Sequence, residues 1–306
     1  MSVFTVVLIK LIPLYIIIAL GFLAGRFSNV SPESIAGLLI HIITPVVIIG
    51  YVADISITIA NLTVPLLVFV MCAVMEGLFY WIGKRAFTDS TANLLALSAA
   101  TGNIGYFGIP LYVLLFPGDG LGVYMLAFTG MLFFELTLGF YMIARGRFSI
   151  WQSLKQFIKL PPVYAVFAGM AISVMHLPIP DVVRGMIENF RSVYIVLGSL
   201  MIGLGMSRIR KFEIDRRYTL LTHVAKFAVW PIMVYGIISL DRYVLHMYNP
   251  VVYNCLIVFA VVPLMVDVVM FATQLHVKPE KAATGVFVST VFALLYIPIV
   301  YGLFLK

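Results

Sequence analysis

The chain has 306 residues, of which 62% are hydrophobic and only 11% are charged. This composition excludes an ordinary soluble domain and predicts an all-α protein that crosses a membrane several times. The net charge of +7 is not a nucleic-acid signal, because most lysines and arginines lie in short loops between apolar segments. We therefore expect a lipid bilayer around the protein and no nucleic-acid partner.

The first half of the chain, residues 1–147, is predicted to contain five membrane-spanning helices. They cover about 3–25, 31–53, 62–83, 90–116 and 121–144. Ser31 as N-cap and Pro32 at the first helical position mark the start of the second span. Pro45 predicts a kink or hinge within that span.

The fourth span carries the most informative motif, which runs from Gly102 to Pro110. Its three glycines and one proline together cost a continuous helix about 6 kcal/mol relative to alanine. We therefore expect the helix to unwind near Asn103 to Gly108, with Gly108 as a hinge. Such breaks at membrane depth are typical of transporter binding sites, because protein or a watered cavity must satisfy the freed backbone groups. The alternative is that the glycines only let a neighbouring helix approach closely.

Two further segments follow this half. Residues 148–160 are predicted to form an interfacial amphipathic helix, because apolar residues such as Trp151 and Leu154 recur at helical spacing between basic ones. The second half, residues 161–306, is predicted to contain five more spans. They cover about 161–176, 180–206, 218–240, 250–275 and 282–305.

The two halves show signs of an internal repeat. Pro13-Leu14-Tyr15 matches Pro162-Val163-Tyr164 at an offset of 149, and the next spans match at an offset of 148. Five spans per half force the second repeat to have inverted topology. The ninth span should then be broken like the fourth, after Pro263, and Asp267 follows four residues later.

The basic residues also predict how the chain is oriented. The loops that follow odd-numbered spans hold 14 lysines and arginines, whereas the opposite side holds five. The positive-inside rule places the more basic loops in the cytoplasm. We therefore expect a protein of the plasma membrane or inner cell membrane with both termini outside the cytoplasm.

Four polar residues inside the spans are candidates for function. Asn103 at the predicted break either contacts a substrate or ion or caps the broken helix. Asp267, Glu76 and Glu135 are carboxyls at membrane depth, so one of them is expected to carry a proton or bind Na⁺. The alternative for Asp267 is an ion pair with a basic residue.

Lys226 and Arg191 are the two basic residues considered for that ion pair. The sequence has no metal-ligand spacing, no paired aspartates of the protease type and no His-Glu-x-x-His pattern. We therefore expect neither an enzyme nor a metal site, and no cofactor other than a coupling H⁺ or Na⁺.

The chain resembles the auxin efflux carrier family of secondary transporters over nearly its whole length. The most specific match is the motif from Gly102 to Leu111. The segments around Pro13, Thr44-Pro45 and Pro263 are similar to other motifs of the family.

The resemblance implies ten helices in two inverted five-helix repeats, with spans 4 and 9 broken and crossed as in sodium–proton antiporters. Spans 1, 2, 6 and 7 would form a scaffold that dimerises, and the other six would form a transport domain that moves like an elevator. A small organic anion would bind at the crossover. The candidate binding residues are Gly102, Asn103, Gly105, Tyr106, Pro110, Pro263 and Asp267.

Asp267 stands where a neutral residue is usual in the family. An acidic residue there keeps a second function open, a sodium- or proton-coupled symporter or antiporter of the bile-acid-symporter type.

Overall fold

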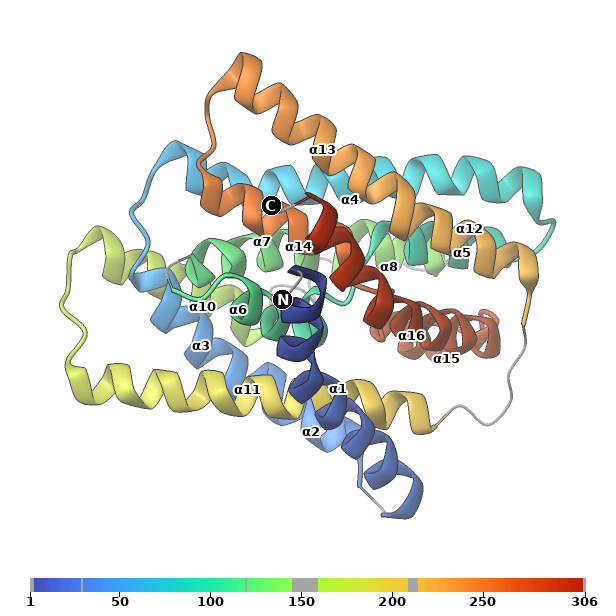
Figure 1. Cartoon of the computed structure of the whole chain (residues 1–306), viewed down its shortest axis with the longest axis horizontal. Coiled ribbons are helices and arrows are strands. Elements are labelled where there is room, and N and C mark those ends of the chain that lie inside the picture. Colours follow the sequence, from blue (N-terminus) through green and yellow to red (C-terminus); the bar gives the residue numbers. More distant parts are fainter. Residues whose placement is uncertain (1–2, 29, 119, 145–158, 209–213, 305–306) are drawn as a thin grey trace.

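The computed structural model describes residues 3–28, 30–118, 120–144, 159–208 and 214–304, and within these ranges it contains helices and no strand (Figure 1). Eight helical segments there are long and apolar enough to cross a membrane. Two shorter apolar helices, Pro161–Val174 and Pro250–Val261, lie at predicted spans 6 and 9. The chain is thus a polytopic helical protein, and the count of ten spans and their inverted repeat stay predictions.

In chain order the helices are α1 (Val3–Phe27), α2 (Pro32–Leu38), α3 (Thr44–Ala53), α4 (Ile59–Ala86), α5 (Thr91–Ala100), α6 (Ile109–Leu115), α7 (Leu121–Phe134), α8 (Phe140–Ile143), α10 (Pro161–Val174), α11 (Asp181–Ser207), α12 (Arg216–Val224), α13 (Trp230–Leu240), α14 (Pro250–Val261), α15 (Asp267–Gln274) and α16 (Pro279–Phe304). Short π turns extend or join several of them, at Leu39–Ile43, Ile104–Gly108, Glu135–Gly139, Ala225–Val229 and Asp241–Leu245. The amphipathic helix predicted over residues 148–160 lies outside the described residues except for its last two positions.

The helices pack in two groups. In the first, α1 lies along α11, and α3 lies along α10. In the second, α4 packs on α5 and α7, and α13 packs on α14. The two groups meet where α1 contacts α16, α3 contacts α7, and α11 contacts the π turn Ile104–Gly108.

Small residues let α1 and α11 approach closely. A Cβ added to Gly21 would collide with the backbone of Leu200, and one added to Gly203 would collide with the backbone of Ile18. The first group is therefore tightly packed along its longest contact.

Prolines explain three of the π turns in the described part of the chain. Each of these turns ends two residues before a proline, namely Pro45, Pro110 and Pro231. A proline cannot donate to the carbonyl four residues earlier and its ring crowds that carbonyl, and a wider turn relieves the clash. The π turn Leu39–Ile43 therefore lies where the sequence predicts a kink.

Hydroxyl groups from other helices satisfy two carbonyls that prolines leave without their usual donor. Pro298 cannot donate to Leu294 O, which accepts the Tyr15 hydroxyl at 2.7 Å. The carbonyl four residues before Pro231, that of Phe227, accepts the Tyr296 hydroxyl at 2.8 Å. These bonds matter because an unsatisfied backbone group inside a bilayer costs several kcal/mol.

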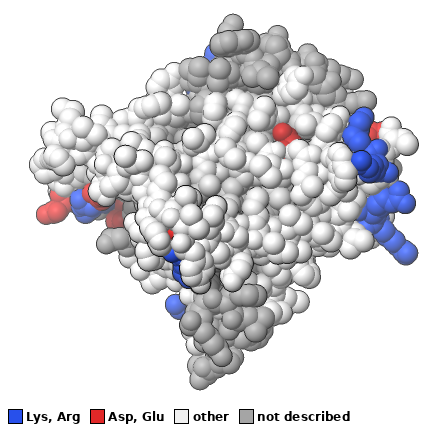
Figure 2. All heavy atoms as spheres, turned by 90° about the horizontal axis from the view of Figure 1, so that it is seen from above, with Lys and Arg blue, Asp and Glu red and all other residues white. Residues whose placement is uncertain are grey.

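Charged residues tie helix ends together at one end of the molecule, where lysine and arginine side chains gather (Figure 2). Asp215 caps α12 and pairs with Lys281 at 2.8 Å, and Lys281 also reaches Thr91 at the start of α5. Partial burial raises the pKa of Asp215, but the bonds from Lys281 and from the backbone N–H of Tyr218 outweigh it. The net pKa lies below the ordinary value of an aspartate, so this clamp stays ionised at neutral pH.

Candidate functional site

Two interrupted helices meet at the centre of the described structure. α5 ends at Ala100 and α14 ends at Val261, and in both places the chain continues in extended conformation. The backbone N–H of Asn103 donates to the carbonyl of Pro263 at 2.9 Å. This bond places the two breaks, Thr101–Asn103 and Val262–Val266, side by side, and we call this place the crossover.

The break in the fourth span is shorter than the sequence predicts. Unwinding was expected from Asn103 to Gly108, but Ile104–Gly108 forms a π turn. The reason is that Asn103 holds this turn, since its carbonyl accepts from Gly108 N at 2.9 Å and its Oδ1 accepts from Phe107 N at 3.2 Å. The non-helical residues between α5 and the π turn are Thr101, Gly102 and Asn103, of which Thr101 is extended.

Side chains from other helices satisfy the backbone groups that the breaks release. Trp230 Nε1 donates to Ala99 O at 2.8 Å, and Lys226 Nζ donates to Phe259 O at 3.2 Å. On the donor side, the N–H of Leu264 bonds to Ser289 Oγ at 3.1 Å. The π turn Ala225–Val229, α13 and α16 therefore supply the side chains that satisfy the two breaks.

Polar side chains fill the space left by the three glycines of the motif. A Cβ on Gly102 would collide with Lys226 Nζ, and one on Gly105 would lie 3.1 Å from the Tyr194 hydroxyl. A Cβ on Gly108 would collide with the Tyr124 hydroxyl. The nearest neighbours of these glycines are thus side chains from three separate elements rather than the backbone of one packed helix.

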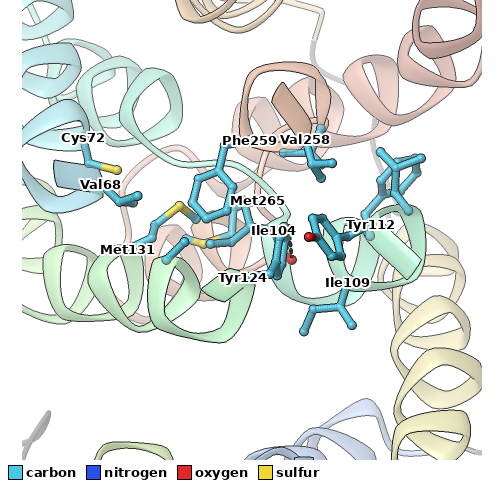
Figure 3. Close-up of a cluster of buried hydrophobic side chains, with 14 of the residues drawn as sticks. Val68, Cys72, Ile104, Ile109, Tyr112, Tyr124, Met131, Val258, Phe259 and Met265 are labelled. Atoms are coloured by element: carbon cyan, nitrogen blue, oxygen red, sulfur yellow. Dashed lines mark hydrogen bonds between the residues drawn. The ribbon is translucent and has the colours of Figure 1, made fainter. Parts of the chain in front are cut away.

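Tyr124 lies at the centre of the core beside the crossover (Figure 3). Its hydroxyl donates to Ile104 O at 2.9 Å, and its ring lies 4.8 Å from that of Tyr112 and 5.4 Å from that of Phe259. One aromatic side chain therefore connects the π turn with the end of α14.

Of the two polar atoms in the side-chain amide of Asn103, only the oxygen forms a hydrogen bond among the described residues. The residue is 2% exposed, and its Oδ1 caps the π turn, but its Nδ2 has no hydrogen-bond partner among the described residues. The sequence predicts either capping or ligand contact for Asn103. The two roles are compatible, because each uses a different atom of the amide.

Acidic and phenolic groups gather on another side of the crossover. Asp267 is the first residue of α15, and its carboxylate interacts electrostatically with Glu135 and with the hydroxyls of Tyr106 and Tyr194. Tyr106 also packs against the backbone at Gly198 of α11. The predicted site residues Asp267, Glu135 and Tyr106 therefore lie in one neighbourhood.

The ion pair considered for Asp267 does not form within the described part of the chain. Arg191 pairs with Glu188 instead, and Lys226 has no carboxylate within 4.0 Å. The two partners expected from the sequence thus lie elsewhere, and no described lysine or arginine is within ion-pair range of Asp267.

Glu76 is the third predicted carboxyl, and it lies on α4. It is 4% exposed, and its Oε1 has no partner among the described residues. The thiol of Cys72, one turn away, interacts electrostatically with Glu76, Glu135 and Lys226. Glu76 therefore faces the same interior region as the crossover.

Pro110 and Pro45, the remaining candidates, lie apart from each other. Pro110 is buried at the start of α6, directly after the π turn. Pro45 lines a shallow groove of about 420 Å³ between α3 and α10. The groove is bordered by Pro45, Ile49, Lys159, Pro161, Tyr164, Ala165 and Ala168. It lacks the polar groups of the crossover, so Pro45 is not part of that site.

The comparisons with known proteins agree with this architecture. Residues 144–301 match the model of a family described as membrane transport protein. The chain belongs to this family, that of the auxin efflux carriers. This carrier is also 24% identical, over 247 residues that make up 77% of each chain, to an uncharacterized transporter of Methanocaldococcus jannaschii. The match to the family model includes the second break, at Pro263, and not the first.

The carrier's site also contains residues that the sequence analysis did not select. Tyr124, Tyr194 and Trp230 look like ordinary apolar core residues in their spans, and no signal separates them from their neighbours. Lys226 does carry a signal, because a lysine flanked by apolar residues within a span is costly unless it has a role. From the sequence, Lys226 is a candidate only as an ion-pair partner for Asp267.

Proposed function

We propose that this transport protein is a secondary carrier, or a uniporter, for a small organic anion such as a carboxylate. The anion binds at the crossover of the two broken helices. The observation that carries the proposal is Asn103 Nδ2, a buried donor without a partner at the point where the chain turns. Leaving such a group unpaired costs about 1–3 kcal/mol, which a bound ligand recovers.

The helix ends favour an anion at this donor. The π turn Ile104–Gly108 begins directly after Asn103 and continues into α6, so the partial positive charge at its N-terminus lies at the break. The other N-terminus at the crossover, that of α15, already holds the carboxyl of Asp267. The N-terminus at Asn103 is thus the one that a substrate carboxylate would complement.

The packing supports an elevator-type movement. The helices form two groups, and α11 presents Gly198 to Tyr106 and Gly205 to Val266 across the boundary between them. At these two glycines α11 has no side chain that interlocks with the second group, which would let the two groups slide past each other. We also propose a homodimer through the first group, which contains α1, α3, α10 and α11, and termini outside the cytoplasm.

The experiment uses Asn103→Asp in proteoliposomes. Asp keeps the acceptor that caps the π turn but replaces the Nδ2 donor with a negative charge. Exchange of labelled malonate, benzoate or indole-3-acetate by the wild type should fall roughly 10- to 100-fold in the variant, as expected for a lost bond of about 1.5–3 kcal/mol to a charged group.

Asn249→Asp is the matched control. Asn249 is exposed and caps α14 through its Oδ1 in the same way, at 3.2 Å from Val252 N. The control should exchange like the wild type. Wild-type exchange by a folded Asn103→Asp variant would remove Asn103 from the substrate site.

The second candidate function is transport of the anion coupled to Na⁺ or H⁺. This coupling is favoured by the electrostatic interaction between Asp267 and Glu135. Neither carboxyl has a cationic partner among the described residues. Two carboxyls in one buried region are stabilised when they share a proton or bind a cation.

A further inference from the structure

Lys226 occupies an unusual place for a charged residue. It lies in the π turn Ala225–Val229 within the eighth span and is 1% exposed. Its Nζ donates to Phe259 O at 3.2 Å and lies 4.5 Å from the centre of the Trp230 ring. The ammonium is thus withdrawn from solvent and from the bilayer surface.

The ammonium touches both broken helices. The carbonyl of Phe259 is available because Pro263, four residues later, has no N–H to donate. On the other helix, Lys226 Nζ fills the space beside Gly102, the residue before Asn103. Lys226 therefore lies beside the residue that precedes Asn103, whose side-chain donor the proposed function assigns to the substrate.

The charge of Lys226 is not balanced within the described part of the chain. An ammonium has three N–H donors, and the hydrogen bond from Lys226 Nζ to Phe259 O uses one of them. No described carboxylate lies within 4.0 Å of Nζ. The partial negative charge at the C-terminal ends of α5 and α14 and the Trp230 ring offset part of the burial cost, but a buried charge without a counter-ion remains costly.

We propose that Lys226 is a substrate-binding residue whose ammonium supplies the counter-charge for a carboxylate of the transported anion. The carboxylate lies between Lys226 Nζ and Asn103 Nδ2. This inference rests on the proposed function, and it adds that the site distinguishes an acid from its neutral amide by charge.

The test compares acids with their amides on the purified full-length protein. Thermal unfolding is followed with malonate and malonamide, with benzoate and benzamide, and with indole-3-acetate and indole-3-acetamide. The wild type should be stabilised by at least one acid and not by the matching amide. Lys226→Gln keeps a donor for Phe259 O but has no charge, so it should fold and bind that acid at least tenfold more weakly. Lys226→Arg should retain the preference for the acid.

Two further variants exclude a purely structural explanation. Lys84→Met removes an exposed cation and should behave like the wild type. Gly102→Ala keeps the lysine but displaces its ammonium, so it should also lose the acid-dependent shift, including when Lys226→Gln does not fold. If folded Lys226→Gln, or Gly102→Ala, binds the acid as the wild type does, the role of Lys226 is overturned and the proposed function is not. A wild type that responds to no acid, or equally to acid and amide, would overturn the proposed function as well.

Discussion

Asn103 and Asp267 show how single residues in this protein serve the backbone and the site together. Asn103 holds the π turn with its carbonyl and its Oδ1 and leaves its Nδ2 free. Asp267 is the first residue of α15, where its carboxylate complements the positive N-terminus of the helix. It also interacts electrostatically with Glu135. Each residue therefore has one role that a conservative variant can retain and one that it cannot.

Asp267→Asn separates the two roles of Asp267. An ionised Asp267 repels an anionic substrate, and this repulsion is stronger in a low-dielectric interior than in water. Anion binding by the wild type should therefore strengthen as the pH falls or as Na⁺ is added. Asn imitates the neutral form, so the variant should bind the anion but lose this dependence, as measured by thermal shift over a pH series at constant ionic strength.

Glu135→Gln and Glu76→Gln are the comparison variants for that measurement. If Asp267→Asn keeps the full pH or Na⁺ dependence, then coupling does not run through Asp267. Whichever of the two glutamine variants loses the dependence would then identify the coupling residue.

Residue identities alone predicted part of the site. A lone Asn among glycines and a lone Asp after a proline were visible because polar groups and helix breakers are rare in membrane spans. Trp230, Tyr124 and Tyr194 were not visible, since aromatic residues are common in such spans. Their role depends on which carbonyl or glycine they face, and that follows only from how the helices pack.

At the scale of elements, three prolines leave backbone carbonyls free to accept hydrogen bonds from other helices. The carbonyls four residues before Pro231, Pro263 and Pro298 each accept from a side chain of another helix. The donors come from α16, from the π turn before α13 and from α1. Each proline thus creates an acceptor that fixes one helix against another.

Tyr15→Phe tests this explanation through a double-mutant cycle with Pro298→Ala. Alone, Tyr15→Phe should cost about 1–3 kcal/mol, because it leaves Leu294 O without a donor. Alanine at position 298 restores the helical N–H, so in that background Tyr15→Phe should cost less than about 0.5 kcal/mol. Reversible unfolding in detergent or bilayers measures both values.

Tyr164→Phe, on the exposed face of α10, is the matched control and should be neutral in both backgrounds. An equal cost of Tyr15→Phe with and without Pro298 would show that the freed carbonyl is not what Tyr15 satisfies.

The interruption of both spans was predicted from helix breakers, and both spans are interrupted. The extent of the first break was predicted wrongly, because propensities count the cost of Gly and Pro but not the bonds that let a π turn form over Ile104–Gly108. In the second break, Pro263 marks the position correctly even though no glycine accompanies it.

At the scale of the molecule, the two helix groups meet at the crossover. Hydropathy and caps predicted the spans to within a few residues, since apolar length and N-cap residues are local properties. The grouping of α1, α3, α10 and α11 was expected from the family resemblance, and local sequence does not encode it. Which group moves, and whether two copies associate, stays a prediction.

The central claim is that an anion binds where the two broken helices cross. The most direct measurement is a structure of the wild-type protein with a brominated carboxylate that stabilises it, such as 4-bromobenzoate, located by the anomalous signal of bromine. We predict that the carboxylate lies within hydrogen-bond distance of Asn103 Nδ2, beside Pro263. A ligand bound only in the groove between α3 and α10, or at any other place away from the crossover, would contradict the account.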